Sequence, residues 1–240
     1  MTSYWDRYVA DWASDELKWP GDEWCDDENW LHMQFDRLVG RADVENWKRA
    51  VEIGPGSGKH ALMVLNASEA ELRAFDISSQ FMATCAKRCH DEIASGRLSL
   101  NQIDVRNPAS VLDALQDWRR KVDGFYSLEA MVHVDLQYLI VYFISAALVL
   151  RPGGKLVMNV ATATNEQGFG LLLSDLKHYW TVQLEPSAKF EWLSRDLVEH
   201  VLKQLGFEFD FISDEDRRDV EFIASLESPE VADKFEMYLR

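Results

Sequence analysis

A glycine-rich turn near residue 50 carries the residue pattern with the clearest chemical meaning in this chain. Residues 51–58 read Val-Glu-Ile-Gly-Pro-Gly-Ser-Gly, so that Glu52 precedes three closely spaced glycines. We predict a short strand that ends at this turn and a helix that begins near Lys59. Such a turn brings bare backbone N–H groups and a helix N-terminus close to a ligand. The spacing therefore predicts a ligand site here.

The spacing of the glycines excludes two phosphate-binding patterns. The dinucleotide fingerprint needs glycine at the first, third and sixth positions, but here the third glycine comes one residue early and Lys59 takes the sixth position. A phosphate-cradling loop needs a glycine and a Ser or Thr where this chain has Ile53 and His60. What remains is Glu-x-Gly-x-Gly-x-Gly, or a Gly-Pro-Gly turn that simply joins a strand to a helix.

Three later segments read as strands that end in polar residues, and residues 150–158 read as a turn entering a fifth strand. Asp76 follows Gly58 by 18 residues, close to the spacing at which an acid at a strand tip accepts hydrogen bonds from a ribose diol. The carboxyl ends of parallel strands face one crevice. We therefore expect four positions to converge there: Gly54, Asp76, Asp104 at the end of a strand from Leu98, and Ser127 at the end of a strand from Val122.

Taken in order, these segments resemble the class I S-adenosylmethionine (SAM)-dependent methyltransferases. The resemblance covers roughly residues 4–226 and includes Leu-x-Pro-Gly-Gly-x-Leu at residues 150–156. It implies an α/β fold with a Rossmann-like, seven-stranded, mostly parallel sheet, helices on both faces and an antiparallel last strand. It also implies SAM as cofactor, S-adenosylhomocysteine (SAH) as product, no metal, and a cofactor site built from Tyr8, Glu52, Gly54, Gly56, Gly58, Asp76, Ile77, Asp104, Val105 and Ser127.

The segment Ser127–Asp135 lies where the resembled family places its catalytic residues. His133 matches a frequent histidine of that family and could accept a proton near neutral pH. Glu129 could do the same if desolvation raised its pKa, or it could hold a cationic acceptor. The alternative is that His133 packs structurally. The resemblance implies in-line methyl transfer to a nitrogen or oxygen nucleophile of a small molecule. A protein or peptide methyltransferase and a non-catalytic SAM-binding protein remain alternatives.

We interpret the chain as one domain with four parts. Residues 1–48 form a helical cap, 49–161 the SAM-binding core, 162–191 a cap insertion, and 192–240 the last core helix and strands. Five of the nine tryptophans lie in the first 30 residues, with nine acids against two bases. The resemblance implies that this cap closes over the cofactor, with Tyr4 and Tyr8 above it, and an acidic aromatic lid would suit an amine acceptor. An amphipathic helix docked by its aromatic face is the alternative.

Composition narrows the partners and the location. A formal net charge of −16 disfavours nucleic-acid binding, which depends on Lys and Arg, and it disfavours anionic membranes. No run of 18 apolar residues occurs, so we predict no membrane span. The three cysteines and the absence of a signal-like N-terminus indicate the cytoplasm. Cys85 and Cys89 lack visible further metal ligands, which favours apolar packing. The choice between monomer and homodimer stays open.

Overall fold

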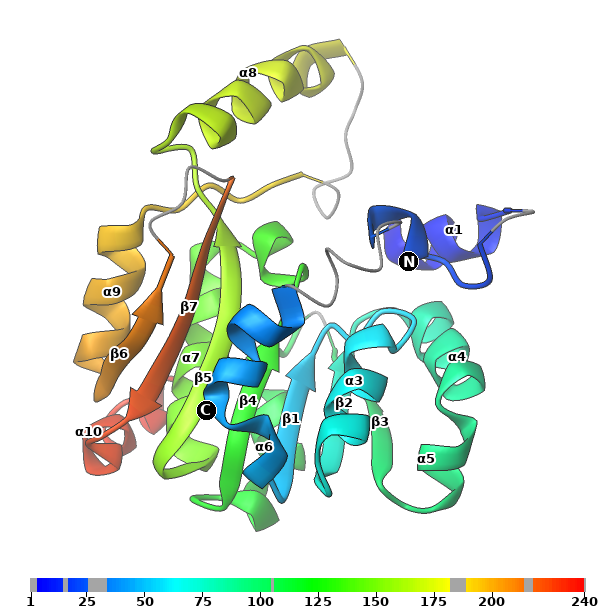
Figure 1. The fold of residues 1–240 in the computed structure, drawn as a ribbon. Helices are drawn as coiled ribbons and strands as arrows, with labels where there is room; N and C mark the ends of the chain where they lie inside the picture. Colours follow the sequence, from blue (N-terminus) through cyan, green and yellow to red (C-terminus); the bar gives the residue numbers. More distant parts are fainter. Residues whose placement is uncertain are drawn as a thin grey trace.

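A seven-stranded sheet forms the centre of the molecule (Figure 1). The structure is a computed structural model that describes residues 4–14, 17–25, 34–104, 106–181, 189–213 and 218–239. The strand order is β3-β2-β1-β4-β5-β7-β6, and β7 runs antiparallel to both β5 and β6. The predicted fold class is therefore confirmed. The strands are β1 (Arg49–Ile53), β2 (Glu71–Asp76), β3 (Leu98–Gln102), β4 (Val122–Ser127), β5 (Leu150–Ala161), β6 (Phe207–Ile212) and β7 (Asp219–Leu226).

Helices cover both faces of this sheet, with α3 on one face and α6 and α7 on the other (Figure 1). Residues 34–38 are also helical, and short 3-10 turns include Asp22–Cys25 and Met131–His133. The α-helices are α1 (Tyr4–Asp11), α3 (Lys59–Ala67), α4 (Ser79–Arg88), α5 (His90–Ala94), α6 (Ser110–Ala114), α7 (Leu136–Val149), α8 (Glu166–Thr181), α9 (Arg195–Gln204) and α10 (Pro229–Asp233). Among the described residues, no helix is both long and apolar enough to cross a bilayer.

The alternation of side chains along each strand divides the core into two layers. Val51 and Ile53 of β1 pack with α7 in one layer, whereas Ala50 packs with α3 in the other. Glu52 therefore points toward the α3 side, where it is opposite Tyr126 of β4 in the parallel register. This placement turns the Glu52 carboxyl into the sheet packing and away from the strand tip.

Ser194 caps the start of α9, because its side chain accepts a hydrogen bond from the backbone N–H of Leu197 at 3.2 Å. The third strand, predicted to reach Asp104, ends instead at Gln102. Asp104 accepts the backbone N–H of Arg106 at 2.9 Å and forms an isolated bridge with Asn107. These contacts form a tight turn. An aspartate favours such a turn because its carboxylate accepts the backbone N–H two residues later.

Candidate functional site

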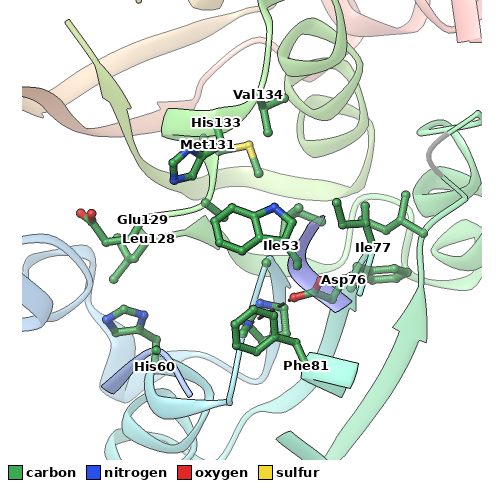
Figure 2. A pocket seen from close by; sticks show the side chains of 18 of the residues that line it. Ile53, His60, Asp76, Ile77, Phe81, Leu128, Glu129, Met131, His133 and Val134 are labelled. Carbon is green, nitrogen blue, oxygen red and sulfur yellow. Dashed lines mark hydrogen bonds between the residues drawn. The ribbon is translucent and has the colours of Figure 1, made fainter. Parts of the chain in front are cut away.

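A pocket opens at the carboxyl ends of β1, β2 and β4, and Figure 2 shows the side chains around it. It encloses about 1040 Å³ of space, its open mouth included. Half of the predicted site residues line it: Gly54, Gly56, Asp76, Ile77, Glu129 and His133. Segments far apart in the sequence thus meet at this edge of the sheet.

Gly54 brings the β1 turn against the loop that follows β4. Its φ angle is +73°, a left-handed conformation that favours glycine. A Cβ atom at this position would lie 2.3 Å from the Cβ of Ala130, far inside van der Waals contact. The two loops can therefore touch at the pocket floor because residue 54 has no side chain.

Asp76 presents a buried carboxyl group to the pocket. Its side chain accepts backbone N–H groups of Ser78 at 2.8 Å and of Gly56 at 3.3 Å. Burial raises the pKa of Asp76 to about 6, although these N–H groups pull it back toward its usual value. A carboxylate has about four acceptor positions, so Asp76 can still accept two hydroxyl groups of a ligand.

Five other predicted residues lie around the pocket rather than on its surface. Ser127 donates its hydroxyl to the carbonyl of Ile53 at 2.6 Å. The hydroxyl of Tyr8 accepts the backbone N–H of Gly21 at 3.2 Å. Asp104 is exposed, and Glu52 is buried in the sheet packing. Gly58 abuts the α4–α5 junction, while Val105 lies outside the described residues.

Gly58 packs closely against two buried cysteines, Cys85 and Cys89. A Cβ atom on Gly58 would lie 2.6 Å from the Sγ of Cys85 and 2.8 Å from the Sγ of Cys89. Both thiols are fully buried in the apolar layer that contains α3. The pair thus packs beneath the glycine turn, in agreement with the apolar interpretation of these cysteines.

Glu52 is deeply buried and has a raised pKa. Its side chain is buried, and burial raises its pKa to about 8, an effect that the neighbouring Tyr126 hydroxyl partly offsets. The group is therefore largely protonated at neutral pH. A neutral carboxyl is the less costly form in an apolar layer, since a buried charge without a cationic partner is strongly unfavourable.

His133 lies at the pocket between two aromatic rings. Its ring stacks on Phe190 at a centroid distance of 5.0 Å and meets the edge of Trp5 at 5.2 Å. Nδ1 lies 2.9 Å from the carbonyl oxygen of Lys189. Because a carbonyl only accepts, Nδ1 carries the hydrogen and Nε2 keeps a lone pair in the neutral ring. Burial lowers the pKa of His133 below its usual value, which favours this neutral form.

Glu129 belongs to a charged network at the rim of the pocket. It adopts a left-handed backbone with φ of +62°. Its carboxylate accepts the side-chain amides of Gln34 at 2.8 Å and Asn159 at 2.7 Å, and it pairs with Arg218. These partners come from residues 34–38, from β5 and from the residue directly before β7. The network fixes the orientation of Glu129 and balances its charge.

Helix α1 covers part of the pocket, above the sheet edge and beside α4 (Figure 1). Trp5 lines the pocket and also packs on Phe81 at a centroid distance of 6.3 Å. Asp6 accepts the hydroxyl of Ser78 at 2.7 Å and the backbone N–H of Gln80 at 3.1 Å. The helix is therefore attached to the N-terminal end of α4.

Several pocket residues had no part in the predicted site. Phe81 lies at the start of α4 and Tyr142 comes from the apolar helix α7. Trp5 is in the aromatic cap but was not assigned to the site. Lys59 and His60 directly follow the third glycine, and their position at the start of α3 is the one signal that could have identified them.

The residues present fit an adenosyl ligand. The Asp76 carboxyl has acceptor positions for a ribose diol, and Gly54 and Gly56 leave the turn without side chains. Ile77, Phe81 and Ile103 give the pocket apolar walls, which suit a flat purine ring.

Comparisons with known proteins agree with this geometry. A family model described as a methyltransferase domain matches residues 51–158. No curated protein sequence matches the chain at a significant level. Among solved structures, magnesium protoporphyrin IX methyltransferase from Synechocystis PCC 6803, with bound SAH, is similar with a TM-score of 0.62 and 14% identity, covering 93% of each chain.

Two further solved structures show the same likeness. The PH0226 protein from Pyrococcus horikoshii OT3 has a TM-score of 0.60 and 15% identity, covering 83% of this chain and 92% of its own. Geranyl diphosphate C-methyltransferase from Streptomyces coelicolor A3(2) has a TM-score of 0.58 and 11% identity, covering 81% and 76%. At these identities the likeness is one of fold.

Proposed function

We propose that this protein, in which residues 51–158 match a family model described as a methyltransferase domain, is a SAM-dependent enzyme that methylates a nitrogen or oxygen atom of a small molecule. The observation that carries the proposal is the pocket itself. It joins the glycine turn, the Asp76 carboxyl and the His133 ring on one surface.

In this proposal the cofactor lies across the strand tips. Asp76 accepts its ribose hydroxyls, Gly54 and Gly56 allow its close approach, and Ile77 contacts its adenine. Five other predicted ligands, Tyr8, Glu52, Gly58, Asp104 and Ser127, shape this site mainly from behind or beside it. SAM supplies a methyl group on a sulfonium, which an acceptor displaces in line, so the protein mainly aligns the acceptor and excludes water.

His133 is the proposed base for acceptors that lose a proton. Its Nδ1 is held by the Lys189 carbonyl, which leaves the Nε2 lone pair to take a proton. Glu129 contributes a carboxylate at the rim, and its pairing with Arg218 fixes its orientation. A carboxylate oriented in this way can accept a hydrogen bond from a hydroxylated or amine acceptor.

The cover formed by α1 supports a small acceptor. Trp5 sits against His133, and Asp6 ties its helix to α4, so the acceptor space is bounded above as well as below. A protein substrate would suit a more open cleft. The aromatic walls favour an acceptor with an apolar or aromatic body.

A coupled assay tests the proposed reaction directly. The purified protein is incubated with SAM and a panel of small amines, phenols and alcohols, and SAH formation is measured for each compound. We expect turnover with at least one amine or hydroxylated compound. Labelling of proteins in a lysate without turnover of any small molecule would instead favour a protein methyltransferase. SAH binding without transfer to either class would favour a non-catalytic protein.

Replacement of His133 tests its role as base. We expect His133→Ala to lower kcat about a hundredfold or more with an acceptor that must lose a proton. Because the pKa of His133 lies below its usual 6.5, the acid limb of the wild-type rate profile should fall below that pH. The exposed His90 supplies the control variant His90→Ala. Near wild-type turnover of His133→Ala would remove this residue from the mechanism.

A further inference from the structure

Arg218 joins two segments of the chain that lie beside the pocket. Its Nη2 donates to the Glu129 carboxylate, and its guanidinium lies over the Phe190 ring, 4.9 Å from the ring centroid. Glu129 belongs to the loop after β4, and Phe190 to the segment between α8 and α9. An ion pair and a stacking contact therefore attach both segments to one side chain.

The Arg218 side chain is itself held in a fixed position. Its Nε lies 3.2 Å from the Asp219 carboxylate. Its backbone N–H donates to the Gln167 side chain at 3.1 Å, and its carbonyl accepts the backbone N–H of Thr162 at 2.6 Å. A planar guanidinium that pairs with two carboxylates has little freedom to rotate. Arg218 can thus support the groups that it contacts.

Phe190 connects this support to His133. The two rings stack with their centroids 5.0 Å apart, a distance at which aromatic pairs attract each other. The His133 Nδ1 donates to the Lys189 carbonyl at 2.9 Å. One residue further on each side, the N–H of Glu191 donates to the Val132 carbonyl at 2.8 Å. The imidazole therefore rests on a ring that a guanidinium holds in place.

The charges around His133 come from the same contacts. Burial is the main cause that lowers the pKa of His133, Arg218 lowers it further, and Glu129 raises it. Lys189 meets the imidazole with its carbonyl, while its ammonium pairs with Glu191 at 2.7 Å. Helix α1 meets the imidazole with an uncharged indole. The positive charge of Arg218 therefore offsets the negative charge of Glu129 beside this ring.

We propose that Arg218 is a positioning residue for His133, an inference that rests on the proposed function of His133 as base. Arg218 acts through the Phe190 ring and through Glu129. Figure 2 shows His133 and Glu129 on one side of the pocket and Asp76 on the other, so these contacts set the geometry at the end away from the ribose. A displacement of about 1 Å at such a group is costly to the rate.

NMR spectra of the histidine rings test this assignment in the free protein, without an acceptor. The His133 signals are assigned by their loss in His133→Gln, and Phe190→Leu shows their position when the stacking ring is absent. We expect Arg218→Lys and Arg218→Gln both to move these signals toward those of Phe190→Leu, because neither new side chain has a guanidinium to stack. Arg218→Gln should also raise the pKa of His133, because it removes the charge that offsets Glu129, whereas Arg218→Lys should not.

Arg151→Gln is the matched control, because Arg151 pairs with Asp123 at 2.6 Å near the start of β5. It should leave the His133 signals and pKa unchanged. If Arg218→Gln fails to fold, Arg218→Lys, which keeps the positive charge, still tests the position of the ring. His133 signals that stay at their wild-type positions in the folded Arg218 variants would overturn the inference.

Kinetics then separate this inference from the proposed function. With an acceptor that the wild type methylates, Arg218→Gln should lower kcat about tenfold and leave KM for SAM unchanged, and Arg218→Lys should restore part of kcat. A higher KM for SAM with an unchanged kcat would contradict a role through His133. A wild-type protein that shows the expected NMR changes but methylates no acceptor would contradict the proposed function and support the contact between Arg218 and His133.

Discussion

Asp76 is a buried carboxyl group with a raised pKa, and it lies where the ribose would bind in the proposed function. Its pKa is raised to about 6, chiefly by burial, so the free protein protonates this group within an accessible pH range. Hydroxyl donors bind better to the ionised form. Ligand binding and proton release at Asp76 should therefore be coupled.

We predict that SAH affinity falls as the pH drops below about 6. Below the free pKa each pH unit should raise Kd by up to about tenfold, because the ligand must displace a proton. Above it the Kd should be flat. Calorimetric titrations between about pH 5 and pH 8 measure this slope. Asp76→Asn provides the matched control, which should bind weakly without this slope, whereas an equal slope in both proteins would assign the proton to another group.

Glu52 should affect stability in a pH-dependent manner. Its folded-state pKa of about 8 lies above its usual 4.5, so the folded protein retains a proton that the unfolded chain releases. Between these values the free energy of unfolding should therefore decrease as the pH rises, by at most about 1.4 kcal/mol per unit. Glu52→Gln resembles the protonated form and lacks this loss.

The variant should consequently gain melting temperature over the wild type at pH 8 more than at pH 5. Glu45→Gln, at an exposed position, controls for the change in net charge. Thermal melts of the three proteins without ligand measure the difference. If the difference in melting temperature between Glu52→Gln and the wild type is the same at both pH values, Glu52 is ionised in the folded protein.

At the scale of elements, hydrogen bonds of Asp6 attach α1 to the N-terminal end of α4, beside the pocket. Asp6 bonds the hydroxyl of Ser78 and the N–H of Gln80, and so adds a carboxylate to the positive end of α4, where it is stabilising. The same helix carries Trp5 into the pocket. Opening the cover therefore requires these hydrogen bonds to break.

We expect Asp6→Ala to destabilise the closed cover by about 1 kcal/mol, the typical loss of a capping interaction. The dissociation rate of SAH should rise severalfold, and limited proteolysis within residues 4–25 should become faster. Stopped-flow displacement and a protease time course measure the two effects. Asp11→Ala, at an exposed position of the same helix, serves as the control. Unchanged dissociation in Asp6→Ala would mean that α1 does not control ligand release.

The elements of the core could be predicted because their signals are local. The glycine turn, the acid at the tip of β2 and the strand-to-turn patterns each lie within a few residues, and the structure places β1, β2 and β4 accordingly. The orientation of Glu52 also follows from the sequence, because alternation from Ile53 turns its side chain to the other face of the sheet.

Other parts of the site depend on contacts that local patterns do not encode. Asp6 meets Ser78 across 72 residues of chain, and nothing in either segment specifies the pair. The network of Glu129 joins residue 34 to residue 218 in the same way. Such contacts follow from the packing of whole elements, and they decide which side chains line the pocket.

At the scale of the whole molecule, the formal charge of −16 has a local exception. Lys59 and Arg88 stand at the start of α3 and the end of α4, around the glycine turn. The charge of Arg88 is balanced by the Asp22 carboxylate at 2.8 Å, whereas Lys59 lines the pocket.

The central claim is that the edge of the sheet at β1, β2 and β4 binds an adenosyl cofactor. Calorimetric titration of SAH into the wild-type protein tests it most directly. Our account predicts saturable binding with one site per chain. The absence of saturable heat at several temperatures, together with no rise in melting temperature at high SAH concentration, would contradict it.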